Sequence, residues 1–234
     1  MDSADTFHLH TFYSSSCCQR IIIAAQLKSI PLKFSYINLT KDEQRKDDYM
    51  RRFNPSGSVP TLVVSSDTRP ELIIRQSATV LEYFEERFPT QHPLLPPTDQ
   101  PMHRALVRDF VNIITNDVQP PTNSRIAKRI RALRGKLDDQ IEFVKTVFID
   151  GLGAYEALLV QTGAESQSRG FTVGEEITMA DICLIPAVDQ ALIYKLDLGF
   201  VPNIMRIYEN LKKMAAFQAA DWRRQEDTPE EHRV

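Results

Sequence analysis

The sequence predicts an α/β domain followed by an all-helical domain. Strand and helix patterns alternate in the order β-α-β-α-β-β-α over roughly the first ninety residues. The stretch from Pro89 to Pro101 then holds five prolines and almost no periodicity, which is typical of a linker. Beyond it only helical spacing appears. We therefore expect domains at 1–89 and 102–234, joined by a linker at 90–101.

Short runs of β-prone residues predict four strands in the first domain. Alternating apolar and polar residues, or compact runs of branched residues, mark a strand. These runs cover 7–12, 32–39, 59–64 and 71–74. The third run opens with a proline, which is tolerated at the start of a strand. Residues 65–70 are rich in turn formers and predict a hairpin loop between the last two strands.

Three helices are expected between these strands and after them. Residues 14–16 are serines that can cap an apolar helix over 21–28. The polar stretch 41–52 predicts a second, weaker helix. Ser77 is expected to cap an amphipathic helix over 78–88.

Helical spacing fills the second half of the chain, over 102–124, 126–162, 178–195 and 201–215. The run Thr178–Asp181 has the pattern of a capping box, in which the cap side chain and the third helical side chain bond each other's backbone amides. Ile177 and Ile182 are placed as a hydrophobic staple around it. We interpret this element as structural.

Composition is typical of a soluble globular protein. The chain has 234 residues, of which 42% are hydrophobic and 25% charged, and its formal net charge is −3. This balance gives no electrostatic reason to expect nucleic acid as a partner. Residues 1–5 are acidic and precede no apolar run, and the longest apolar stretch, 21–25, is far too short to cross a membrane. We expect a cytoplasmic protein with no membrane contact.

Three cysteines argue against a disulfide framework and against a metal site. Cys17 and Cys18 are adjacent, and Cys183 lies in an apolar helical pattern that predicts a core position. Dithiol redox chemistry needs the spacing Cys-x-x-Cys, and Ser15 occupies the first position of that spacing. A redox enzyme that attacks with its own two sulfurs is therefore not expected.

Motifs along nearly the whole chain carry a family resemblance. The run Ser15–Ala24 reads Ser-Ser-Cys-Cys-Gln-Arg-Ile-Ile-Ile-Ala. It resembles Ser-Ser-Cys-x-Trp-Arg-Val-Arg-Ile-Ala, the signature of the zeta class of glutathione transferases. Further matches, in order, are Asn54-Pro55, Val59–Leu62, Gln76-Ser77, Glu82-Tyr83, Val118–Pro120, Val173–Asp181 and Asp227–Pro229. The resemblance implies a thioredoxin-like first domain, the glutathione-transferase fold, glutathione as cofactor and a homodimer.

The start of the first helix is the expected catalytic site. Unpaired amides and the positive end of the helix dipole stabilise a thiolate there. The resemblance assigns this role to Ser15, Ser16 and Cys17, with a serine hydroxyl donating to the sulfur of glutathione. The alternative is that these serines only cap the helix.

Two further positions are expected to bind glutathione. The resemblance implies a cis bond between Val59 and Pro60, with the Val59 backbone pairing with the cysteine of glutathione. Gln76 and Ser77 begin a helix, whose amides and hydroxyl suit the γ-glutamyl carboxylate. A strand-entry proline and an ordinary helix cap are the alternatives. Gln119, in a matching motif, is also assigned to glutathione binding.

Three departures from the family pattern bear on the substrate. Gln19 replaces the signature tryptophan, and Ser58 replaces a glutamine that helps to hold glutathione. Ile193 stands where the family has an arginine that binds a substrate carboxylate. Because isoleucine cannot replace the bidentate guanidinium group, an apolar substrate is favoured.

The expected activity is glutathione-dependent cis–trans isomerisation of a conjugated carbon–carbon double bond by reversible thiolate addition. We expect an apolar, polyketide-type olefin of secondary metabolism as the small-molecule substrate, in a pocket that includes Asn112 and Ile193. One alternative is maleylacetoacetate, an intermediate of tyrosine breakdown, with Arg108 or Arg125 binding its carboxylate. Others are a transferase that forms stable conjugates and a non-catalytic binding module. The serine pair and the two glutathione-binding motifs argue against the last.

Overall fold

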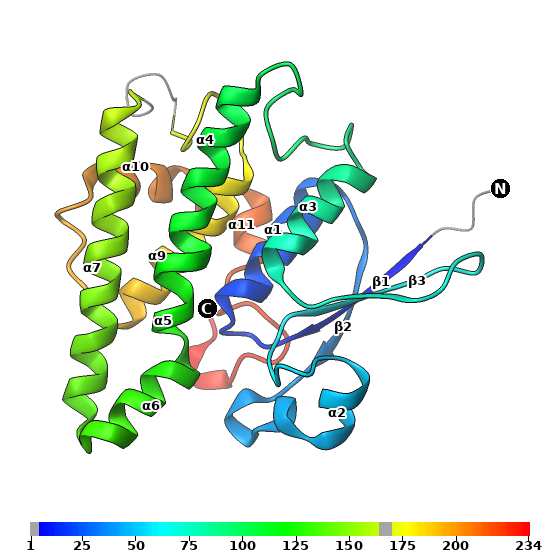
Figure 1. Cartoon of the computed structure of the whole chain (residues 1–234), viewed down its shortest axis with the longest axis horizontal. Helices are drawn as coiled ribbons and strands as arrows, with labels where there is room; N and C mark the ends of the chain where they lie inside the picture. Colours follow the sequence, from blue (N-terminus) through cyan, green and yellow to red (C-terminus); the bar gives the residue numbers. More distant parts are fainter. Residues whose placement is uncertain (1–4, 164–169) are drawn as a thin grey trace. The chain divides into compact units, whose positions relative to one another are not determined.

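The computed structural model describes residues 5–163 and 170–234 (Figure 1). Two compact units make up the chain: the first runs up to Pro93 and also includes Ala215–Val234, and the second is Leu94–Met214. Residues 215–234, which the sequence predicted as part of the helical domain, thus group with the α/β unit. Residues 1–4, on which the expected absence of a signal segment partly rests, lie outside the described residues.

A four-stranded mixed sheet is the centre of the first unit, as predicted. Its strands are β1 (Thr6–Thr11), β2 (Leu32–Tyr36), β3 (Thr61–Ser65) and β4 (Leu72–Ile74). Their order across the sheet is β2-β1-β3-β4. Strand β1 is parallel to β2 and antiparallel to β3, and β3 forms an antiparallel hairpin with β4. The predicted hairpin loop is confirmed.

The connection from β2 to β3 is less helical than expected. It contains two 3₁₀ turns, η1 (Leu39–Lys41) and η2 (Glu43–Arg45), and only one short helix, α2 (Asp47–Arg52). The Asn38 side chain accepts hydrogen bonds from backbone amides of η1. Strand β2 therefore ends at Tyr36, two residues before this cap. Asp42 has a φ of 52°, a left-handed conformation that interrupts any continuous helix.

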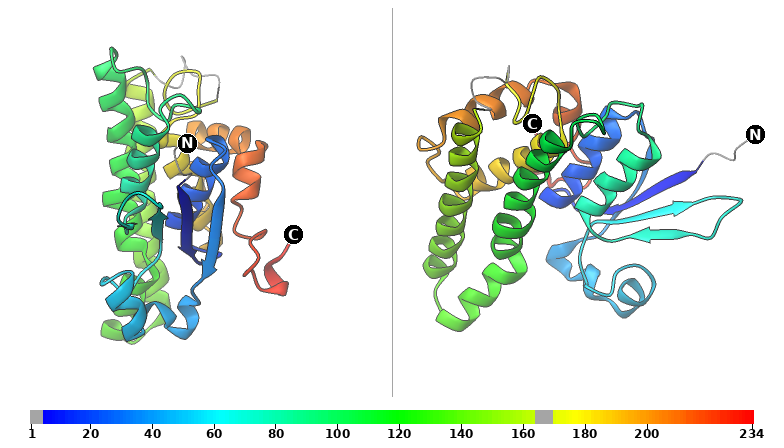
Figure 2. Two further views of the ribbon diagram at one scale, coloured as in Figure 1. Left: turned by 90° about the vertical axis from the view of Figure 1, so that its right-hand side faces the viewer. Right: turned by 45° about the horizontal axis from the view of Figure 1, so that its top comes forward.

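Helices α1 (Ser16–Leu27) and α3 (Ser77–Arg87) lie side by side against one face of the sheet (Figure 1). Residues 18–25 of α1 are all buried, since this helix contacts both α3 and α11 (Ala215–Ala219). Figure 2 shows α11 and the following C-terminal segment within the first unit. The core combines apolar side chains of all these elements, among them Leu9, Ile21, Leu62, Leu81 and Phe84. Burial of each such side chain stabilises the fold by about 2 kcal/mol.

A buried lysine fixes the C-terminal end of α1. Lys28 is 1% exposed. Its ammonium group donates to Glu85 Oε2 at 3.0 Å, to the Phe88 carbonyl at 2.8 Å and to the Gln91 carbonyl at 3.1 Å. Three protons therefore meet three acceptors, so the charge is buried with its hydrogen-bonding capacity filled. These contacts attach α1 to the end of α3.

Helices, joined by turns and loops, make up the regular secondary structure of the second unit in its described residues. Its helices are α4 (Pro101–Asn112), the π-helical stretch η3 (Ile113–Val118), α5 (Gln119–Thr122), α6 (Ser124–Arg134), α7 (Leu137–Gln161), α9 (Met179–Ile193) and α10 (Pro202–Leu211). The segment predicted as helical over 126–162 is divided at Gly135, whose φ of 77° ends α6. The capping box at the start of α9 is confirmed, because the Asp181 carboxylate accepts from the Thr178 amide at 2.8 Å. Cys183 is fully buried, as expected.

The π-helical stretch packs closely against α7. A Cβ atom added at Gly151 of α7 would collide with the Val118 side chain at the end of η3. Glycine at this position therefore allows the close approach of the two elements. The contact sets where Gln119, the next residue, begins α5.

Membrane-spanning helices are not found in the part of the chain that the structure describes, where none is long and apolar enough to cross a bilayer.

Replacing Lys28 with methionine should lower the free energy of unfolding by about 3 kcal/mol, because Glu85 and two carbonyl groups lose their buried partner. Chemical denaturation of the two proteins would measure the difference. Arg51→Met is the matched control, since Arg51 is an exposed cation whose ion pair with Asp48 is also exposed. Equal losses in the two variants would contradict a structural role for the Lys28 contacts.

Candidate active site

Three of the predicted binding elements meet at one end of the sheet. His10, near the end of β1, pairs with Thr61 at the start of β3, and Leu62 pairs with Ile74 at the end of β4. The turn into α1, the entry to β3 and the turn into α3 consequently share this end (Figure 1). The register of the sheet therefore brings together Ser15, Val59 and Ser77, which are far apart in the sequence.

Ser15 is the N-cap of α1, with extended backbone angles of φ −84° and ψ 107°. Its Oγ accepts a hydrogen bond from the Cys18 amide at 3.3 Å. The hydroxyl hydrogen remains able to donate to another group. The backbone amides of Ser16 and Cys17 lie in the first turn of α1, where no carbonyl of the same helix can accept from them. They point out of the helix end. Hydroxyl, amides and helix dipole together form a site suited to a negatively charged sulfur.

The two neighbouring cysteines differ in their surroundings. Cys17 is partly exposed, whereas Cys18 is 1% exposed. Burial raises the pKa of the Cys18 thiol to about 11. Cys18 is therefore protonated at neutral pH, which agrees with the exclusion of dithiol chemistry made from the sequence.

The Val59–Pro60 peptide bond is cis, as the family resemblance implied. Val59 precedes the first paired residue of β3, so its backbone groups lie outside the hydrogen-bonded ladder of the sheet. The preceding Ser58 carbonyl accepts from the Tyr49 hydroxyl at 3.1 Å and from Asn54 Nδ2 at 3.0 Å. Burial raises the pKa of Tyr49 to about 12, so its phenol stays protonated and can donate. These two side chains hold the Val59 segment in place.

Gln76 and Ser77 form the start of α3, but the predicted cap is wrong by one residue. Gln76 is the N-cap, without a side-chain hydrogen bond, and Ser77 is the first residue of the helix. Ser77 is 5% exposed. Its Oγ accepts from Arg20 Nη1 at 3.2 Å. The serine is therefore engaged by a buried guanidinium group from α1 and not by its own helix.

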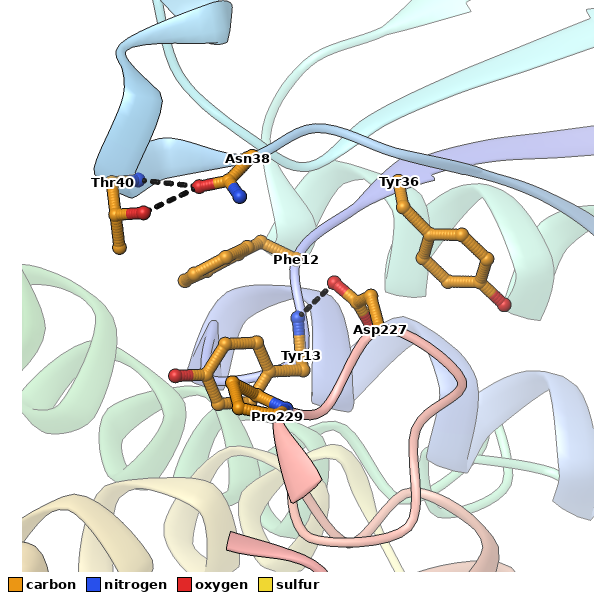
Figure 3. A pocket seen from close by; sticks show the side chains of 7 residues that line it. All are labelled: Phe12, Tyr13, Tyr36, Asn38, Thr40, Asp227 and Pro229. Carbon is orange, nitrogen blue, oxygen red and sulfur yellow. Dashed lines mark hydrogen bonds between the residues drawn. The ribbon is translucent and has the colours of Figure 1, made fainter. Parts of the chain in front are cut away.

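A small cavity lies beside the turn from β1 into α1 (Figure 3). Its volume is about 170 Å³, and its lining residues are Phe12, Tyr13, Tyr36, Asn38, Thr40, Asp227 and Pro229. The Tyr13 amide donates to Asp227 Oδ2 at 2.9 Å, and Asn38 Oδ1 accepts from the Thr40 amide and hydroxyl. This volume is below the roughly 300 Å³ of common ligand pockets. None of the predicted site residues lines it.

The C-terminal segment supports the catalytic turn from this side. Asp227 holds the Tyr13 backbone, and the Tyr36 hydroxyl donates to Glu226 Oε2 at 2.9 Å. Burial raises the pKa of the Asp227 carboxyl, and also that of the Tyr13 phenol. The motif Asp227–Pro229 was noticed in the sequence as a family match, but its contact with the turn before Ser15 was not predicted.

The remaining predicted residues lie in the second unit. Asn112 is the last residue of α4 and is exposed, and Gln119 is the first residue of α5 and is half-buried. The π-helical stretch separates them, and such stretches are frequent at functional sites. Ile193 ends α9 with 44% of its surface exposed.

Several residues of the first unit were missed as contributors to the site. Tyr49 and Asn54 support Val59, Asp227 supports the β1–α1 turn, and Arg20 contacts Ser77. Asn54, Asp227 and Arg20 all fall in motifs shared with the family, which was the available signal. Tyr49 lies outside those motifs, and only the folded chain places it.

Thioredoxin-like topology, a cis proline at the third strand and an open helix start define an enzyme class that binds a thiol peptide. Comparison with known families agrees. The family model for the glutathione S-transferase N-terminal domain matches residues 14–87, and that for the C-terminal domain matches residues 151–215. The chain belongs to the glutathione S-transferase family, in its zeta class. The predicted fold and the predicted cofactor, glutathione, are confirmed.

Individual relatives match over almost their whole length. A probable glutathione S-transferase of Coccidioides immitis is 44% identical, over 97% of this chain and 98% of the relative. The maleylacetoacetate isomerase maiA of Aspergillus fumigatus is 43% identical, over 97% and 94%. A crystal structure of maleylacetoacetate isomerase from Anaeromyxobacter dehalogenans with bound glutathione has a TM-score of 0.84 at 30% identity, over 97% of this chain and 100% of that one.

Alkylation of the native protein should modify Cys17 well before Cys18 and Cys183. At pH 8 a thiol with a pKa of about 11 is ionised in only about one molecule in a thousand, and both later cysteines are buried. Mass spectrometry of peptides after brief iodoacetamide treatment would give the order. Denatured protein, in which the three should react alike, is the control. Early labelling of Cys18 would contradict the described surroundings of this thiol.

Proposed function

We propose that this chain is a glutathione-dependent cis–trans isomerase acting on maleylacetoacetate. The helix start at Ser15, with its hydroxyl and open amides, carries the catalytic part of the proposal. The relatives at 43% and 42% identity, both named maleylacetoacetate isomerase, support the substrate. They favour this alternative over the apolar secondary metabolite that Ile193 led us to expect.

Bound glutathione supplies a thiolate for reversible addition to a conjugated double bond, which rotates while it is single. The residues of this chain hold and stabilise the charged sulfur. Ser15 donates its hydroxyl, and the amides of Ser16 and Cys17 add further donors at the positive end of α1. Because these donors favour the ionised form, they lower the pKa of the thiol and keep it nucleophilic at neutral pH.

Two other elements would hold the peptide part of glutathione. The Val59 backbone, outside the sheet ladder, can pair with an extended peptide as an added strand does. Ser77 and the first amides of α3 can bind a carboxylate. Gln119 is assigned to the same cofactor by the family resemblance.

A carboxylate of the substrate requires a cation, which Ile193 cannot provide. Arg108 and Asn112 are four residues apart on α4 and so lie on the same face of this helix. Arg108 is partly buried, whereas Arg125 on α6 is exposed. Of the two arginines considered from the sequence, we therefore favour Arg108 as the group that binds the substrate carboxylate.

The homodimer implied by the resemblance and the cytoplasmic location expected from the composition stay predictions.

Ser15→Ala should raise the pKa of enzyme-bound glutathione and lower kcat by about 10- to 100-fold, the effect of losing one hydrogen bond to a charged group. Ultraviolet titration of the thiolate and initial rates would measure the two quantities. Ser66→Ala, in the hairpin at the opposite end of the sheet, is the control. An unchanged thiol pKa would show that Ser15 only caps α1.

With glutathione far below the substrate concentration, maleylacetoacetate should be converted completely, because an isomerase regenerates its cofactor. A transferase would stop once glutathione was consumed. Arg108→Leu should raise KM for maleylacetoacetate about tenfold and have little effect on its dimethyl ester, because both carboxylates of the ester are uncharged. A preference of the wild-type enzyme for the ester would instead support the apolar substrate that the sequence predicted.

A further inference from the structure

Two buried cations of α1 differ in how their charge is compensated. Lys28 and Arg20 are each 1% exposed. All three protons of Lys28 have acceptors. For Arg20, the contact from Nη1 to Ser77 Oγ is the bond shown, and Nε and Nη2 have no hydrogen-bond partner among the described residues.

A guanidinium group buried with open donors is costly unless a negative charge lies nearby. None of the ion pairs found among the described residues includes Arg20, and its hydrogen-bond partner Ser77 is itself buried. The open donor atoms are shielded from solvent as well. Folding therefore places a positive charge beside Ser77 at the start of α3, where an added anion would balance it.

The Arg20 bond also orients the Ser77 hydroxyl. Since Ser77 Oγ accepts from Arg20, its hydrogen is directed to a different acceptor. The first amides of α3 point to the same end of that helix. A carboxylate bound there would meet a hydroxyl donor, amide donors and the field of a buried cation. Hydrogen bonds in such a chain strengthen one another.

We propose that Arg20 is a positioning residue for glutathione, acting through Ser77 on the carboxylate of the γ-glutamyl group. Because its free donor atoms are inaccessible, it acts through the serine hydroxyl and through its charge. The inference rests on the proposed binding of glutathione at Ser77. It adds a specific requirement: the effect of Arg20 depends on a negative charge at one place on the ligand.

Arg20→Met should raise KM for glutathione roughly tenfold, the expected effect of losing a charge-assisted contact. The value of kcat at saturating glutathione should stay close to that of the wild type, since the donors around Ser15 are untouched. The decisive ligand is γ-aminobutyryl-cysteinyl-glycine, which is glutathione without the γ-glutamyl carboxylate. With this analogue, Arg20→Met and the wild type should have the same KM.

Two further variants separate the possible outcomes. Lys28→Met should destabilise the protein but keep the wild-type KM for glutathione, because that cation is paired within the fold. Ser77→Ala should weaken glutathione binding and leave binding of the analogue unchanged. If Ser77→Ala has no effect on either ligand, the proposed glutathione site is wrong.

If Ser77→Ala behaves as expected but Arg20→Met raises KM equally for both ligands, Arg20 is a structural residue and the inference is overturned. The same comparison with Arg20→Lys, which keeps the charge and loses the planar group, decides the matter if the methionine variant does not fold.

Discussion

The start of α1 is the feature on which the remaining structure of the site depends. Its first amides must stay free of protein acceptors and yet be held in a fixed direction. The buried run 18–25 packs α1 against α3 and α11, and Lys28 attaches its far end to the end of α3. Ser15 caps the near end without using its own proton. Rigid packing along the helix thus keeps a set of donors in place for a ligand.

Charge in the first unit is arranged around this helix. Lys28 and Arg20 are both removed from water, and the difference between them lies in their partners. A filled set of acceptors makes Lys28 part of the fold. Arg20, next to Ser77, keeps donor atoms without a partner among the described residues. In the proposed complex, the γ-glutamyl carboxylate of glutathione balances its charge. Cys18 is buried as well, and its burial keeps the thiol neutral.

Family membership and substrate rest on different grounds. The match to both glutathione S-transferase domains, and identity above 40% with fungal relatives, define the family and the cofactor. The identity of the substrate depends on single side chains. Ile193 favours an apolar substrate, whereas Arg108 favours a substrate with a carboxylate. Relatives named for maleylacetoacetate outweigh one departure from their pattern, because a carboxylate can be bound by an arginine from another helix.

By itself the sequence determined the strands, most helices, the capping box of α9 and the motif around Ser15, since these depend on local periodicity and on residue types at fixed spacing. It misplaced the cap of α3 and assigned residues 215–234 to the helical domain. Contacts between distant segments decide such features. The bond from Arg20 to Ser77 spans 57 positions, and that from Tyr13 to Asp227 spans 214. Packing within the first unit, which no local pattern encodes, brings these groups together.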